Sequence, residues 1–101
     1  MIKVGVFYPL TAKFDWDYYL HKHTPMIKKL LSPAMKKVDI EQGIAGGGPG
    51  APATYTTICN LHFESVEAFQ NAFAPHAQEI MGDIANYTDV QPLVQISEIK
   101  M

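Results

Sequence analysis

The sequence predicts an α+β fold of the ferredoxin-like type, with elements in the order βαββαβ and an antiparallel sheet that carries two helices on one face. Two observations predict it. Four short segments have the composition of strands, and two longer segments repeat apolar residues every three or four positions, as helices do. The 101 residues are enough for one such domain and too few for two, so we expect a single domain over residues 1–101.

The first predicted elements are a strand over residues 2–8 and a long helix over Phe14–Leu31. In the strand, Ile, Val and Tyr alternate with Lys, Gly and Phe, and Pro9 ends the alternation. Asp15 is a suitable N-cap for the helix. Because proline has no N–H, Pro25 should kink the helix or restart it. At about 3.6 residues per turn, the inward stripe is expected to contain Trp16, Tyr19, Leu20, His23, Ile27, Leu30 and Leu31.

A second strand and a glycine-rich connection follow this helix. Ser32-Pro33 ends the helix, and Met35–Ala45 is the predicted strand. The next segment, Gly46–Ala53, lacks the Lys-Ser/Thr ending of a phosphate loop and does not match the dinucleotide-binding glycine pattern. We therefore interpret it as a mobile connection between two strands.

The remaining elements are a strand, a helix and a strand. The third strand is predicted over Thr54–Phe63, with one face formed by Tyr55, Thr57, Cys59, Leu61 and Phe63. Ser65 is a suitable N-cap for a second helix, which Pro75 interrupts and Gly82 ends. A loop with the sequence GDIANYTD then leads to the last strand, Leu93–Ile99.

The sheet in this arrangement has one face that no helix covers. The first and third strands nevertheless carry large apolar residues on both faces. A two-fold dimer matches one surface patch to itself, so a second copy of the chain is the simplest cover. We expect a homodimer.

Composition excludes several classes of function. The net charge is -2, and all eight basic residues are lysines, so neither a nucleic-acid surface nor an arginine clamp for anionic substrates is expected. No apolar run approaches the ~20 residues of a membrane span, and the start IKVGVFY is too short for a signal peptide. The single Cys59 cannot form an internal disulfide and suggests the reducing cytoplasm.

Four segments together resemble the EthD family, which is named for ethyl tert-butyl ether degradation: YYLHKHTPMIKKLL, AGGGPGAPA, FESVEAFQNAFAPHAQEIMGDIANYTD and VQPLVQISEI. The resemblance implies the dimeric α+β barrel superfamily, in which two ferredoxin-like sheets face each other across a homodimer. It also implies an association with degradation gene clusters. The superfamily includes cofactor-free monooxygenases, muconolactone isomerase, polyketide cyclases and haem enzymes, so the resemblance does not select one reaction.

Tyr19 and His23 are the best candidates for catalytic residues. Both lie on the inward stripe of the first helix, one turn apart, which brings a phenol and a titratable nitrogen together against the core. His23 is suited to act as a general base near neutral pH, and Tyr19 could donate a hydrogen bond to an oxygen that gains negative charge. The alternative is that both are core residues with backbone partners. The helix stripe alone slightly favours this alternative, and the resemblance, which includes the histidine of YLHKHTP, brings the functional role level with it.

Other residues are weaker candidates for a binding site. Three aromatic residues are expected to line a pocket between the first helix and the sheet: Trp16, Tyr55 and Tyr87. His76 takes the matching place on the second helix beside Pro75, although a structural role is the stronger interpretation. A structural or surface role is also expected for His62. The polar residues around Tyr87 could orient a ligand or form turns, and turns are the preferred interpretation: Asp83, Asn86 and Asp89.

Neither a metal nor a cofactor is expected. His21 and His23 lie roughly 200° apart on a helix and cannot share an ion. His23 could serve as an axial haem ligand, but so short a chain leaves little room for the macrocycle. Cys59 has no histidine beside it in the strand alternation, so a thiol nucleophile is not expected.

These observations lead to one working function and two alternatives. The working function is a small cofactor-independent enzyme that acts on an apolar, phenolic or ketonic small molecule in a degradation pathway, with His23 as the base. The first alternative is a non-catalytic binding or accessory protein, which would serve a hydrophobic compound or a partner oxygenase. The second is a structural interaction module, in which the region around Tyr19 and His23 would be fully packed, without a cavity.

Overall fold

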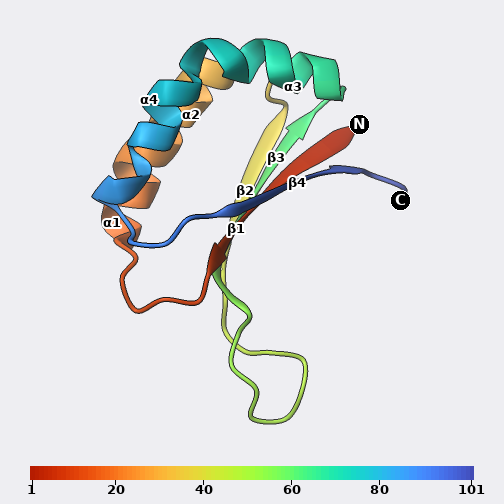
Figure 1. The fold of residues 1–101 in the computed structure, drawn as a ribbon. Coiled ribbons are helices and arrows are strands. Elements are labelled where there is room, and N and C mark those ends of the chain that lie inside the picture. Colours follow the sequence, from red (N-terminus) through yellow and green to blue (C-terminus); the bar gives the residue numbers. More distant parts are fainter.

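The computed structural model describes all 101 residues and contains one antiparallel sheet of four strands. These are β1 (Ile2–Pro9), β2 (Lys37–Gln42), β3 (Tyr55–Phe63) and β4 (Leu93–Glu98), and they lie side by side in the order β2-β3-β1-β4. All helices lie on the same face of the sheet (Figure 1). The predicted ferredoxin-like βαββαβ arrangement is therefore confirmed.

The first helical segment has three parts: α1 (Trp16–Tyr18), a π-helical turn (Tyr19–His23) and α2 (Thr24–Leu31). Asp15 caps it as predicted, because its carboxylate accepts a hydrogen bond from the backbone N–H of Tyr18. The irregularity expected at Pro25 takes the form of the wide turn that directly precedes Thr24. One residue of the predicted stripe is wrongly placed, since Leu20 is 43% exposed.

The second helical segment is also interrupted. It consists of α3 (Val66–Phe73), a 3₁₀ turn that contains Pro75, and α4 (Ala77–Gly82). The Ser65 hydroxyl accepts a hydrogen bond from the N–H of Ala68 and caps α3 as predicted. Within the stretch predicted as a loop, residues 84–86 form a further 3₁₀ turn.

The strands differ from prediction at two places. β2 is shorter than expected, and its pairing with β3 runs only from Lys37 to Gln42. In β1 the register shifts between Tyr8 and Pro9, so that Pro9 pairs with Tyr55 instead of Thr56. This irregularity moves Tyr55 to the face of the sheet opposite the helices, because side chains alternate strictly along a regular strand.

The core between helices and sheet has two parts. The larger cluster joins β1 and β3 to α2 and α4, and it contains Ile2, Val4, Ile27, Leu31, Met35, Cys59, Leu61, Phe63 and Ile80. The smaller cluster is more aromatic and contains Tyr8, Tyr19, Ile84 and Tyr87. The smaller cluster lies where α1, the turn after α4 and the end of β1 meet, and it positions the candidate site.

The opposite face of the sheet is not covered by any element of the chain (Figure 1). Phe7 of β1 lies on this face across from Ile58 of β3 and contacts the ring of Tyr55, with 5.2 Å between ring centroids. None of the helices has the length and hydropathy of a membrane-spanning segment.

Candidate functional site

A cavity of about 340 Å³ lies between the helices and the sheet. Of the 17 residues that line it, 15 are hydrophobic. Its apolar walls are formed mainly by Val4, Leu61, Ile27, Leu31, Phe69 and Phe73. Met81 and Val94 also line it and are 47% and 55% exposed, which places the rim of the cavity between α4 and β4. The volume is in the range of small-molecule sites.

His23 and Tyr19 lie together at the aromatic end of this cavity. Both side chains are buried, at 2% and 1% exposure, and both line the cavity. Their rings stack with centroids 5.4 Å apart and an angle of 15° between planes. The π-helical turn contributes to this geometry, because it contains both residues and presents them on one side of the helix.

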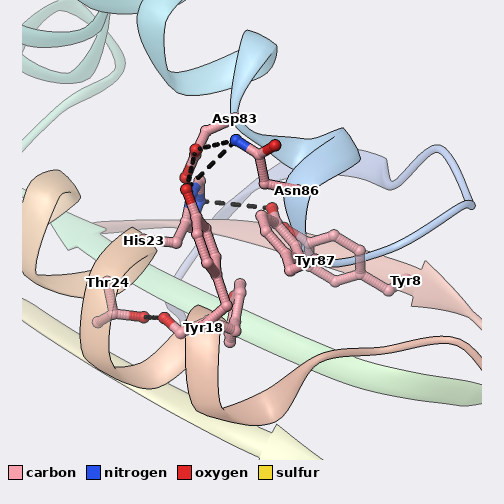
Figure 2. Close-up of polar contacts among 8 residues, drawn as sticks. Tyr8, Tyr18, His23, Thr24, Asp83, Asn86 and Tyr87 are labelled. Carbon is pink, nitrogen blue, oxygen red and sulfur yellow. Dashed lines mark hydrogen bonds and ion pairs between the residues drawn. The ribbon is translucent and has the colours of Figure 1, made fainter.

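Asp83 contacts the imidazole of His23 at Nδ1, the ring nitrogen that does not contact Tyr87 (Figure 2). One carboxylate oxygen, Oδ2, lies 2.8 Å from His23 Nδ1. The other, Oδ1, accepts hydrogen bonds from the Tyr18 hydroxyl at 2.6 Å and the Asn86 amide at 2.8 Å. These contacts join the first helical segment to the turn after α4, so the site depends on the packing of the two.

The protonation states follow from these contacts. Burial lowers the pKa of His23, and the hydrogen bond and charge of Asp83 offset only part of this effect. Partial burial acts to raise the pKa of Asp83, but the hydrogen bonds from Tyr18, Asn86 and His23 outweigh it and lower that pKa. Near neutral pH the pair is therefore a carboxylate and a neutral imidazole that carries its hydrogen on Nδ1.

Two tyrosines extend the contact from His23 into the cavity. The hydroxyl of Tyr87 lies 3.4 Å from His23 Nε2, and it lies 2.8 Å from the hydroxyl of Tyr8 (Figure 2). Burial raises the pKa of Tyr8 to about 12, and it raises the pKa values of Tyr19 and Tyr87 well above the ordinary value. All three phenols are therefore protonated near neutral pH.

The structure brings some of the predicted site residues together and leaves others apart. Tyr19, His23 and Tyr87 line the cavity. Trp16 packs against Phe14 at the edge of the aromatic cluster and does not line the cavity. His76 is half-buried in the 3₁₀ turn before α4 and likewise lies outside the lining.

The expected position of Tyr55 is wrong. The strand alternation put it on the helix-facing side, whereas its ring contacts Phe7 on the open face and does not line the cavity. The cause is the register shift after Tyr8. His62 also lies away from the cavity, on the open face, with Nε2 3.4 Å from a carboxylate oxygen of Asp39.

Asp83 and Tyr8 are residues of this site that the sequence does not identify as catalytic or binding residues. The sequence favours a turn-forming role for Asp83 over a role in the site, yet its carboxylate contacts an imidazole 60 positions earlier in the chain. Tyr8 was assigned only to a strand face, and its hydroxyl contact spans 79 positions. No local pattern could have indicated either contact. The one available signal is that Tyr8 shares a face of the predicted strand with Ile2, Val4 and Val6.

No three His, Cys, Asp or Glu side chains converge in a way that could hold a metal ion. The other histidine of the first helix, His21, is 72% exposed and lies 3.7 Å from Asp17 on the outer surface. What the cavity offers is an apolar volume with a base, three phenols and a buried thiol, Cys59, at one end.

Comparisons with known proteins agree with this architecture. The model of the EthD domain matches residues 8–91. An EthD-like protein from Ralstonia eutropha JMP134 has a crystal structure that superposes with a TM-score of 0.93 at 45% identity, over 99% of this chain and 92% of that one. No curated protein matches the sequence.

Two more distant structures share the fold. An ethyl tert-butyl ether degradation (EthD) family protein from Bacillus halodurans C-125 has a TM-score of 0.77 at 18% identity, over 99% of both chains. A protein from Arabidopsis thaliana has a TM-score of 0.73 at 18% identity, over 100% of this chain and 97% of that one. The domain match and the 45% identity over nearly the whole length lead to one conclusion: the chain belongs to the EthD family.

Proposed function

We propose that this protein is a cofactor-independent enzyme that removes a proton from an apolar small molecule bound in the cavity. The observation that carries the proposal is the buried imidazole of His23 at the end of an otherwise apolar cavity, with 2.8 Å between its Nδ1 and Oδ2 of the partly buried Asp83. A neutral imidazole oriented by a carboxylate is an effective general base near neutral pH.

In the proposed reaction His23 takes up a proton that the substrate loses from a phenol, an enol or an acidic C–H. The imidazolium that results is stabilised by the carboxylate of Asp83. Tyr19 donates its hydroxyl hydrogen to the substrate oxygen that becomes negative, which is the role that the sequence suggested for it. The aromatic side chains around the pair exclude water and strengthen these interactions.

The lining of the cavity supports an uncharged substrate. It contains no lysine, so a carboxylate or phosphate group would find no counter-charge there. An aromatic phenol or ketone fits this chemistry. The ether-degradation name of the family supports a place in a degradation pathway, and a single buried Cys59 suits the reducing cytoplasm.

Hydrogen exchange at carbon tests this function without knowledge of the natural substrate. The probe is 1,3-dihydroxynaphthalene, whose ring C–H between the hydroxyls exchanges with D₂O through the keto tautomer. We expect the protein to accelerate this exchange by about a hundredfold or more, as measured by proton NMR. His23→Ala should abolish the acceleration, and His21→Ala, on the outer surface of the same helix, should retain it. An acceleration that survives His23→Ala would refute the mechanism.

A second candidate function is favoured by the strongly apolar lining of the cavity. A non-catalytic protein that binds a hydrophobic compound, or that assists a partner oxygenase, would need such a volume but no base. The same experiment separates the two. A carrier would bind the probe and leave its exchange rate unchanged in both the wild type and the variants.

We further propose that the functional form is a homodimer in which the open faces of two sheets meet. Phe7 and Ile58 are apolar residues on that face. Asn60 lies on the same face, and its Oδ1 is buried without a hydrogen-bond partner in this chain, although its Nδ2 donates to Asp39. Buried polar atoms rarely stay unpaired, so a donor from a second copy is an economical explanation.

A further inference from the structure

We propose that Tyr8, Tyr87 and His23 form a hydrogen-bond chain of fixed direction, which makes the cavity select ligands that carry a hydroxyl hydrogen, such as phenols and enols, over ketones. The inference rests on the proposed function in that it concerns the ligand of the same cavity. It assigns Tyr8 as the group that contacts the ligand oxygen.

The direction of the chain is set at Asp83. An ionised carboxylate can only accept hydrogen bonds, and Asp83 accepts them from Tyr18 and Asn86 as well as from His23. The imidazole must therefore place its one hydrogen on Nδ1. Its other nitrogen, Nε2, is left with a lone pair and can only accept.

The next two links follow from this constraint. The partner of Nε2 is the Tyr87 hydroxyl at 3.4 Å, which must donate its hydrogen. The oxygen of Tyr87 is then free to accept, and the Tyr8 hydroxyl at 2.8 Å donates to it. Tyr8 has thus used its only hydrogen within the protein, and its side chain lines the cavity. The lone pair that its oxygen keeps is the one that we assign to the ligand hydroxyl.

The opposite direction is unfavourable. If Tyr87 donated to Tyr8, then Nε2 of His23 would be a buried acceptor without a donor. A buried acceptor that is left without a donor destabilises the folded protein. The link at 3.4 Å is long, but an imidazole nitrogen is a stronger base than a phenol oxygen, which also favours donation towards His23.

A ligand hydroxyl matches this arrangement better than a carbonyl. It can donate to the oxygen of Tyr8 and accept from the protonated hydroxyl of Tyr19, whose ring centroid lies 5.8 Å from that of Tyr8. A ketone oxygen can also accept from Tyr19, but it has no hydrogen to donate to Tyr8, so its lone pairs meet those of Tyr8 without a hydrogen between them. Selectivity arises because one buried polar group is then left unpaired.

The same chain offers a route for the ligand proton. The ligand O–H bond breaks as its hydrogen moves to the oxygen of Tyr8, the hydrogen of Tyr8 moves to Tyr87, and that of Tyr87 moves to His23 Nε2. The products are a ligand oxyanion and an imidazolium paired with the Asp83 carboxylate. No electron leaves or enters the site, and after the transfer Tyr8 donates to the oxyanion.

A matched pair of ligands tests the selectivity by calorimetric titration of the purified protein. 1-Naphthol and 1-tetralone have the same bicyclic outline and carry oxygen on the same carbon, as a hydroxyl and as a carbonyl, and naphthalene serves as the oxygen-free reference. We expect 1-naphthol to bind about tenfold more tightly than 1-tetralone, and 1-tetralone to bind no more tightly than naphthalene.

Tyr87→Phe removes the link that orients Tyr8. The Tyr8 hydroxyl can then turn and donate to a carbonyl, so the preference for 1-naphthol should fall to about twofold or less, mainly through tighter binding of 1-tetralone. His23→Phe removes the acceptor at the other end of that link and should have the same effect, which provides a second variant if Tyr87→Phe does not fold. Tyr55→Phe is the matched control, since this phenol lies on the opposite face of the sheet and its loss should leave the tenfold preference.

Three results would overturn the inference: equal binding of 1-naphthol and 1-tetralone by the wild type, absence of saturable 1-naphthol binding, or an unchanged preference in folded Tyr87→Phe and His23→Phe. The titrations report binding alone. A hydroxyl preference without accelerated hydrogen exchange would leave this inference standing and refute the proposed enzyme. Accelerated exchange without a hydroxyl preference would refute this inference and leave the proposed enzyme standing.

Discussion

The protonation state and tautomer of His23 are set by residues far from it in the sequence. Burial alone favours the neutral imidazole, and Asp83 then decides which nitrogen keeps the hydrogen. In an unfolded chain neither constraint operates, and His23 titrates near its ordinary pKa of about 6.5. The difference between the two states makes folding stability depend on pH.

We predict that the protein loses stability as the pH falls through the ordinary histidine pKa of about 6.5. Because the pKa of His23 is lowered by folding, the unfolded chain binds a proton near this pH that the folded chain does not. Asp83 adds a loss of the same sign at lower pH, as its pKa is also lowered in the folded state. Urea unfolding at several pH values measures the effect.

The control for this prediction is the second histidine of the helix. His23→Gln should flatten the dependence of unfolding free energy on pH, whereas His21→Gln should retain it because His21 is exposed. A steeper or unchanged slope in His23→Gln would show that other groups cause the acid sensitivity.

At the scale of the elements, the π-helical turn is the irregularity that shapes the site. The backbone N–H and the hydroxyl of Thr24 both donate to the carbonyl of Tyr19, the latter at 2.8 Å. Pro25 cannot donate a backbone hydrogen bond, so the regular ladder is interrupted directly after this double contact. The result is the stacked pair of Tyr19 and His23.

We predict that Thr24→Val lowers the free energy of unfolding by about 1 kcal/mol, the usual net value of one buried hydrogen bond. Valine keeps the shape of threonine, and Thr24 is buried, so the change removes little besides the hydroxyl contact. Urea unfolding measures the loss. Thr54→Val, at an exposed position before β3, should change stability by less than about 0.5 kcal/mol. Equal effects at both positions would contradict the role given to the Thr24 hydroxyl.

At the scale of the whole molecule, the fold leaves the second face of the sheet open (Figure 1). The rim of the cavity lies elsewhere, between α4 and β4, so a partner on the open face need not block ligand entry. In the proposed dimer the two faces would have separate tasks, with the helix side binding the ligand and the open side contacting a second copy.

We predict that the wild type is a dimer and that Ile58→Asp converts it to a folded monomer. The aspartate would lie across from Phe7 on one side and Glu41 on the other, and would bring a second negative charge to the centre of the open face. Native mass spectrometry at micromolar concentration measures the oligomer. Leu20→Asp removes an exposed apolar residue on the helical side and should stay dimeric. A monomeric wild type would refute the proposed interface.

Local periodicity was sufficient for much of this protein. The alternation in β1, the caps at Asp15 and Ser65, and the inward placement of Tyr19 and His23 depend on residues within a few positions of one another. The order of the elements then restricted the topology, and the four motifs identified the EthD family, which the domain match confirms.

The chemistry of the site was decided only by the tertiary structure. Asp83 and Tyr8 reach the site across 60 and 79 positions, and such contacts leave no period in the sequence. Tyr55 was misplaced for a related reason, since one irregular pair between β1 and β3 reverses the face of every residue beyond it. The sequence by itself therefore determined the fold and placed His23 inward. Only the packing of the turn after α4 against the first helix decided which groups His23 contacts, because pairing between distant segments depends on the whole fold and not on local preference.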